Sequence, residues 1–144
     1  MDSPLFMTPT ASDEQLKSLL DHSKTIAVVG LSPKMQRPSN AVAAYLINHG
    51  YSVIPVNPGH SEILGRACYP DLKSIPAEVD IVDIFRKSSE IGPIVDQAVE
   101  IGAGAVWMQQ GIINEEAADI ALEAGLRVVM DLCIKIEHSR LLIR

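Results

Sequence analysis

The chain is poor in the residues that mark several large classes of protein. Its 144 residues include two cysteines, Cys68 and Cys133, which are too few for the disulfide framework of a small secreted domain. This low number indicates a reducing compartment. No window approaches the roughly 18 uncharged apolar residues of a membrane span, and no basic segment precedes an apolar run as in a secretory signal. Because 47% of the residues are hydrophobic, a core can form. We expect a cytoplasmic protein with a flexible N-terminus at residues 1–11 and one domain over 12–144.

Basic residues are also scarce. Twelve Lys and Arg against 18 Asp and Glu give a net charge of −6, which argues against a nucleic-acid ligand. The acids are distributed unevenly: residues 22–61 contain no Asp or Glu, although 18 acids in 144 residues would place about five there. Lys24, Lys34 and Arg37 lie in the same stretch. Either this gap arose by chance or the segment faces an anion.

Short apolar runs alternate with segments of helical periodicity. The runs at 25–29, 53–56, 81–85, 105–108 and 127–131 suit buried strands, and helices are expected over 12–22, 39–49, 89–101 and 114–124. This alternation is typical of right-handed βαβ units. The sequence therefore predicts an α/β three-layer sandwich: a Rossmann-like, five-stranded parallel sheet in the order 3-2-1-4-5 with helices on both faces. Pro55 favours an edge position for the strand 53–56. Asp131 is expected to cap a closing segment that packs on the sheet through Ile134, Ile136, Leu141 and Leu142.

Ligands of such sheets bind beyond the carboxyl ends of the strands, and the loop that follows the first strand carries the clearest chemistry. Gly30 leaves that strand, and Lys34 and Arg37 bring positive charge. A helix capped by Ser39 would offer free backbone N–H groups to an anion. The helix at 114–124 begins with two glutamates, so its own acids occupy the corresponding end. We expect an anion at the first loop.

The signature of a dinucleotide site is incomplete. Gly30 is followed by Leu-Ser-Pro-Lys instead of the Gly-x-Gly-x-x-Gly pattern, and the second strand ends in Asn57-Pro58-Gly59-His60, without the carboxylate that holds the ribose of NAD. An acid-free end tolerates a phosphorylated ribose. The residues therefore favour an anionic nucleotide with a phosphorylated ribose over NAD.

Several separate motifs follow one another along residues 12–141. They are Val28-Val29-Gly30-Leu31-Ser32-Pro33-Lys34 with Arg37-Pro38-Ser39, Val53-Ile54-Pro55-Val56-Asn57-Pro58, Ile63-Leu64-Gly65, Val82-Asp83-Ile84-Phe85-Arg86, Trp107-Met108-Gln109-Gln110-Gly111 and Cys133-Ile134-Lys135-Ile136-Glu137-His138. Together they resemble the small bacterial and archaeal CoA-binding proteins, a family similar to the CoA-binding domain of the succinyl-CoA synthetase alpha subunit. The resemblance implies a Rossmann-like fold that holds coenzyme A across the carboxyl ends of the strands.

The resemblance also implies a set of ligand contacts. The phosphates would meet Gly30, Leu31, Ser32, Lys34, Arg37, Pro38, Ser39 and Asn40; the adenosine would lie beside Asn57 and Pro58; Phe85 and Arg86 would lie near the adenine or the pantetheine; and Gly111 and Ile113 would flank the pantetheine. Leu132 departs from the family pattern, which often has a basic residue there, so the last loop is not expected to grip a phosphate.

Most of these residues also have a simpler explanation. Lys34 and Arg37 could be solvated loop charges, and Arg86 and Lys87 could be two neighbouring surface residues at a strand end. Asn57 could serve only to shape its turn. Cys133 is either a small buried hydrophobe or a neighbour of the ligand's thiol, in which case CoA disulfide would form a mixed disulfide and shift the mass. The four histidines show no metal-ligand spacing.

The function predicted from the sequence is non-catalytic binding of CoA or acyl-CoA. The synthetases' phosphohistidine lies in a second domain, for which no residues follow Arg144. Two alternatives stay open: an NAD(P)-linked oxidoreductase domain, and a CoA-ligase component that completes its active site with a partner subunit. We expect neither nucleic acid nor membrane as a partner, and leave open a homo-oligomer or a partner enzyme.

Overall fold

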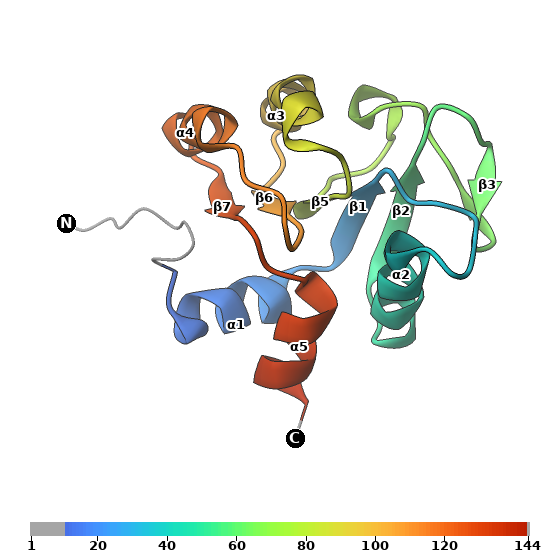
Figure 1. Ribbon diagram of the computed structural model, residues 1–144, viewed down its shortest axis with the longest axis horizontal. Coiled ribbons are helices and arrows are strands. Elements are labelled where there is room, and N and C mark those ends of the chain that lie inside the picture. The colour runs from blue at the N-terminus through green and yellow to red at the C-terminus, as the bar shows by residue number, and fades with distance from the viewer. Residues whose placement is uncertain (1–10, 144) are drawn as a thin grey trace.

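A computed structural model describes residues 11–143 and places a parallel sheet between two layers of helices (Figure 1). The strands are β1 (Thr25–Val29), β2 (Ser52–Val56), β5 (Ile81–Ile84), β6 (Ala105–Met108) and β7 (Arg127–Val129), in the order β2-β1-β5-β6-β7. Every neighbouring pair is parallel. The predicted α/β sandwich is confirmed, whereas the predicted flexible N-terminus falls, apart from Ala11, outside the described residues.

The strand order follows the predicted Rossmann-like pattern with one reassignment. A single parallel bridge joins Val56 of β2 to Tyr69. When Tyr69 is counted as a third strand, the sequence Tyr69, β2, β1, β5, β6 across the sheet reads 3-2-1-4-5, and β7 follows β6 at the far edge. The segment that we expected as the third strand, residues 81–85, instead pairs directly with β1. Pro55 lies on β2 at the edge of the five-stranded sheet, as its missing N–H predicts.

The helices divide between the two faces of the sheet (Figure 1). Helices α1 (Asp13–His22), α2 (Pro38–Asn48) and α5 (Ile134–Leu142) cover one face, and α3 (Ile91–Glu100) and α4 (Glu115–Glu123) cover the other. The remaining elements are short: a hairpin of β3 (Glu62–Ile63) and β4 (Arg66–Ala67), and two 3-10 turns at Leu72–Ser74 and Ser88–Glu90. No helix among residues 11–143 is long and apolar enough to cross a membrane.

Two helices are capped by a side chain at their first turn, and two others do not begin as the sequence predicted. Ser12 caps α1 by accepting the N–H of Gln15 at 3.1 Å, and Asn114 caps α4 by accepting the N–H of Ala117 at 3.0 Å. Helix α2 begins at Pro38, one residue before the predicted cap Ser39, because proline suits the first helical position. Asp131 does not cap α5.

The predicted packing of the closing segment is correct in part. Ile134 is fully buried on the sheet, and Leu141 and Leu142 are partly buried. Ile136, however, is 52% exposed, because it lies on the outer face of α5.

Asp83 is an exception to the apolar interior. It lies in the middle of β5, opposite Val28 on β1 and Trp107 on β6, and is 0% exposed. Neither carboxylate oxygen has a hydrogen-bond partner among the described residues. Burial raises the pKa of this carboxyl well above its usual range, because the charged form loses its hydration. The folded protein therefore favours the neutral acid at this position.

We expect Asp83→Leu to raise the free energy of unfolding, increasingly so at higher pH. Because the pKa of Asp83 is higher in the folded than in the unfolded chain, ionisation favours unfolding. The wild type therefore loses stability as pH rises above the unfolded pKa of about 3.9, by up to about 1.4 kcal/mol per pH unit, until the folded pKa is passed. Urea unfolding of both proteins between pH 4 and 8 measures this difference.

Asp80→Ala is the contrasting variant for that experiment. The Asp80 carboxylate accepts the backbone N–H groups of Lys24 and Thr25 at 2.8 and 3.0 Å. Its removal leaves two donors without this partner, so we expect a loss of about 1–3 kcal/mol. A destabilising Asp83→Leu, with no dependence on pH, would contradict the account of Asp83.

Candidate functional site

Two cavities open at the carboxyl ends of the central strands. The first-loop cavity, of about 510 Å³, is lined by Gly30, Ser32, Pro33, Lys34, Arg37, Pro38, Ser39, Asn57, His60 and Phe85. The central cavity, of about 540 Å³, is lined by Pro38, Val42, Phe85, Arg86, Lys87, Gln109, Gln110, Ile112 and Cys133. Because Pro38 and Phe85 line both cavities, the two lie side by side. Their volumes fall within the range of ligand sites, about 300–1,000 Å³.

The first loop is held in shape by its own polar groups. The N–H of Ser32 donates to Ser39 Oγ at 3.0 Å, and Asn40 Nδ2 donates to the Ser32 carbonyl at 2.9 Å. Ser32 Oγ in turn accepts the N–H of Lys34 at 3.1 Å. Ser39 therefore fixes the loop instead of capping α2, and Asn40, which is buried, supports the loop from behind.

Asn57 joins the first loop to the loop that follows β2. Its Nδ2 donates to the carbonyl of Leu31 at 3.0 Å, and its Oδ1 accepts the N–H of Gly59 at 3.0 Å. The second bond forms the turn that the sequence suggested as the simpler explanation for this residue. The first bond does more, because it holds two walls of the first-loop cavity together.

The charges around the first-loop cavity are of one sign. Lys34 and Arg37 line it, and none of its lining residues among positions 11–143 is a carboxylate. Helix α2 begins at this cavity with no acid in its first turn, whereas α4 begins with Glu115 and Glu116. The positive end of the α2 dipole therefore adds to the side-chain charges. This arrangement favours a ligand with phosphate groups.

The central cavity is bounded by polar side chains that also hold the fold together. Arg86 Nη1 lies 4.0 Å from Glu90 Oε1, so its charge is shared with a neighbouring acid. Gln109 Oε1 accepts the N–H of Ile134 at 3.1 Å, which fixes the start of α5 against the end of β6. Cys133, directly before α5, places its side chain on the wall of this cavity.

The two thiols differ in environment. Cys68 is buried, its Sγ donates to the Asn57 carbonyl at 3.4 Å, and burial raises the pKa of its thiol. Cys133 is half-buried and lines the central cavity. Of the two, Cys133 is the thiol in reach of a ligand in that cavity.

The structure brings most of the predicted site residues together. Gly30, Ser32, Lys34, Arg37, Pro38, Ser39, Asn57 and Phe85 line the first-loop cavity, and Arg86 and Cys133 line the central one. Leu31 and Asn40 are buried beneath the loop. Pro58 lines a smaller cavity beside β2. Ile113 lies on the far side of the loop 109–114, and the N–H of Gly111 donates to Asp131 Oδ1 at 2.6 Å.

Sequence reasoning gave no ligand role to several lining residues: Pro33, Val42, His60, Lys87, Gln109, Gln110 and Ile112. Gln109 could have been found, because it follows a buried strand directly and a polar residue there lies at the carboxyl edge of the sheet. Ile112 and Val42 gave no such signal, since both fit ordinary packing positions. No group of three or more His, Cys, Asp or Glu side chains within residues 11–143 is placed to hold a metal ion.

Comparisons with known proteins show what the chain is similar to. A family model described as a CoA binding domain matches residues 24–139. An uncharacterized protein of Bacillus subtilis, YneT, is 42% identical over 128 residues, which cover 89% of this chain and 95% of that protein. A hypothetical protein from Pyrococcus horikoshii has a solved structure that is 42% identical, with a TM-score of 0.91 and 99% of both chains covered.

A larger relative shares the same segment. An ADP-forming acetate–CoA ligase of Archaeoglobus fulgidus is 31% identical over 127 residues, which cover 80% of this chain but 18% of the ligase. The similarity therefore concerns one part of that enzyme.

Gly30 offers a test of how the first loop is positioned. Its φ is +87°, and a Cβ there would lie 2.5 Å from the carbonyl oxygen of Phe85. Left-handed strain of about 1–2 kcal/mol adds to overpacking of about 1–3 kcal/mol. We therefore expect Gly30→Ala to lower the free energy of unfolding by about 3 kcal/mol, measured by urea denaturation.

Gly50→Ala is the matched control for Gly30→Ala. Gly50 has a similar φ of +94°, but a Cβ there would meet nothing within 4 Å. The Gly50→Ala protein should lose only the free energy of the left-handed strain, about 1–2 kcal/mol. Equal losses at the two glycines would contradict the close approach of Gly30 to Phe85.

Proposed function

The chain belongs to the CoA-binding domain family, and from this premise we propose that it binds coenzyme A or an acyl-CoA at the carboxyl ends of its strands, without catalysing a reaction by itself. The observation that carries the proposal is the pair of adjoining cavities. Among residues 11–143, the first-loop cavity is lined by cations and no acid, which suits a phosphorylated nucleotide, and the central cavity is partly apolar with Cys133 on its wall. Two free thiols fit a cytoplasmic setting.

The nucleotide end of the ligand is proposed to occupy the first-loop cavity. Lys34 and Arg37 would pair with its phosphates, assisted by the dipole of α2. Asn57, with Pro58 beyond it, would lie beside the adenosine. Because the end of β2 carries no carboxylate, a 3′-phosphate on the ribose meets no repulsion there.

The pantetheine is proposed to run through the central cavity. It would pass Phe85, which lines both cavities, and then Arg86, and continue toward Gly111, whose neighbours Gln110 and Ile112 line the central cavity. Its thiol would end near Cys133. An apolar arm with a few amide groups suits a cavity lined by Val42, Ile112 and the amide side chain of Gln110.

The relatives support a second candidate function. A similar segment forms 18% of an acetate–CoA ligase, so this chain could supply CoA to a separate catalytic subunit. Copurification from a native extract with a ligase-like partner would favour this candidate over a module that acts alone. An NAD(P)-linked oxidoreductase is disfavoured, since neither the glycine signature nor an acid at the end of β2 is present.

Calorimetric titration with CoA, dephospho-CoA and NADH tests the proposal. We expect CoA to bind at least about tenfold more tightly than dephospho-CoA, a difference of about 1.4 kcal/mol, because dephospho-CoA lacks the ribose phosphate. Arg37→Ala should weaken CoA binding by about tenfold or more, since a charge-assisted phosphate contact contributes about 1.5–3 kcal/mol.

Lys24→Ala is the control for Arg37→Ala. Lys24 lies in the same acid-free stretch but precedes β1, at the opposite end of the strands, so its removal changes the net charge equally without touching the site. It should leave CoA affinity unchanged. Binding of NADH but not of CoA would refute the proposal.

A further inference from the structure

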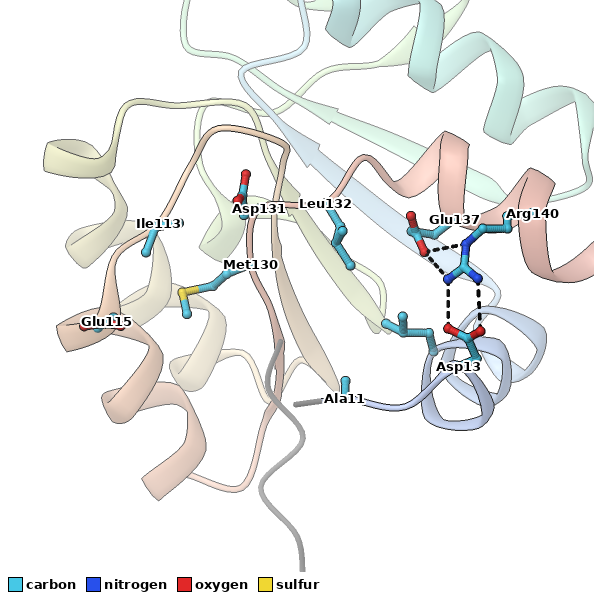
Figure 2. A pocket seen from close by; sticks show the side chains of 10 residues that line it. Ala11, Asp13, Ile113, Glu115, Met130, Asp131, Leu132, Glu137 and Arg140 are labelled. Carbon is cyan, nitrogen blue, oxygen red and sulfur yellow. Dashed lines mark hydrogen bonds and ion pairs between the residues drawn. The ribbon is translucent and has the colours of Figure 1, made fainter. Parts of the chain in front are cut away.

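A third cavity, here called the edge cavity, lies beyond the loops that bound the central cavity (Figure 2). It has a volume of about 560 Å³ and is lined by Ala11, Asp13, Leu16, Ile113, Glu115, Met130, Asp131, Leu132, Glu137 and Arg140. Figure 2 shows Ile113, Met130 and Glu115 on one wall and Asp13, Glu137 and Arg140 on the other, with Leu132 between them. The site described above does not use it.

The edge cavity and the central cavity share the two loops that separate them. In the loop 109–114, Gln110 and Ile112 face the central cavity and Ile113 faces the edge cavity. In the segment after β7, Leu132 faces the edge cavity and Cys133 faces the central cavity. The edge cavity and the wall that carries Cys133 are therefore the two sides of the same two loops, and a group attached to a thiol at Cys133 would pass over one of these loops to reach the edge cavity.

The partition between the cavities is tied at defined points. The N–H of Gly111 donates to Asp131 Oδ1 at 2.6 Å, and Trp107 Nε1 donates to the Leu132 carbonyl at 2.8 Å. Asp131 is held with a φ of 62°, uncommon for a residue other than glycine. These bonds fix Leu132 with its side chain in the edge cavity.

The interior of the edge cavity is apolar. Ala11, Leu16, Ile113, Met130 and Leu132 contribute aliphatic surface, and Ile113 is 49% exposed although it is a large apolar residue. An apolar ligand group would remove this surface from water. The volume leaves room for an acyl chain of several carbons.

The charged residues of the edge cavity disfavour a negatively charged ligand group. Among residues 11–143, the one cation of its lining is Arg140, which already pairs with Asp13 at 2.9 Å and with Glu137 at 2.7 Å. Glu115 and Asp131 add two further carboxylates. Since the lining within this part of the chain holds four carboxylates and one guanidinium, an additional carboxylate in the cavity would be repelled.

We propose that the edge cavity receives the acyl group of an acyl-CoA and selects neutral aliphatic acyl groups over acyl groups that carry a carboxylate. This inference rests on the proposed function, because it requires the pantetheine to end near Cys133. It goes further in naming the class of thioester that the protein distinguishes from free CoA.

Calorimetric titration of the full chain with CoA, butyryl-CoA, hexanoyl-CoA and succinyl-CoA tests the inference. Each buried methylene should tighten binding about fourfold, so hexanoyl-CoA should bind about tenfold or more tightly than butyryl-CoA. Succinyl-CoA, which has the same number of acyl carbons as butyryl-CoA, should bind at least about tenfold more weakly than it does.

Two pairs of variants locate the effect in the edge cavity. Ala11→Trp fills the cavity and should cancel the gain of hexanoyl-CoA over free CoA, whereas Glu14→Trp, at the second residue of α1 and outside the lining, should preserve the gain. Glu115→Lys should strengthen succinyl-CoA binding at least threefold relative to Glu116→Lys. The second substitution makes the same charge change on α4 outside the lining.

The outcomes separate the inference from the proposed function. Equal affinities for CoA and all three thioesters would overturn the acyl site and leave CoA binding in place. Tightest binding of succinyl-CoA would overturn the selection by charge. If neither CoA nor any thioester binds, the proposed function and the acyl site both fail.

Discussion

The close approach of Gly30 to the end of β5 is the constraint on which the site depends. With no side chain at this position, the chain can turn out of β1 with a positive φ and pass against the carbonyl of Phe85. This contact brings the first loop over the end of the neighbouring strand. Phe85 consequently lines both the first-loop cavity and the central cavity, and one ligand can span the two. The bonds from Ser39, Asn40 and Asn57 then hold the loop in that place.

Charge is distributed along the carboxyl edge of the sheet in a definite order. Among the described residues, the first-loop cavity is lined by cations and no acids, whereas the edge cavity is lined by four acids and Arg140. The central cavity between them holds Arg86, Lys87 and two glutamines. An elongated ligand with phosphates at one end and a neutral apolar group at the other matches this order. The net charge of −6 conceals it, because the acids are absent from residues 22–61.

The sequence predicted the class of fold because the fold depends on local patterns, and patterns of the same kind selected the candidate site. Apolar runs at the strands, the glycine after β1 and the missing acids could all be seen in the chain itself. Three features could not. The direct pairing of 81–84 with β1 depends on Tyr69, and not a regular strand, taking the place beside β2. The role of Ser39 depends on a contact with Ser32 across the loop, and the edge cavity depends on α1, α4 and α5 meeting beside β7. Each arises from residues far apart in the sequence or from a turn whose geometry no pattern specifies. Asp83 is a similar case, since a carboxylate in a strand ordinarily indicates a solvent-facing position.

A crystal structure of the protein with coenzyme A tests the central claim most directly. Our account predicts the ligand's phosphates within hydrogen-bond distance of Lys34 and Arg37, its pantetheine beside Phe85, and its thiol next to Cys133. Coenzyme A bound at the amino ends of the strands instead, in the cavity lined by His49, Tyr51 and His138, would contradict the account.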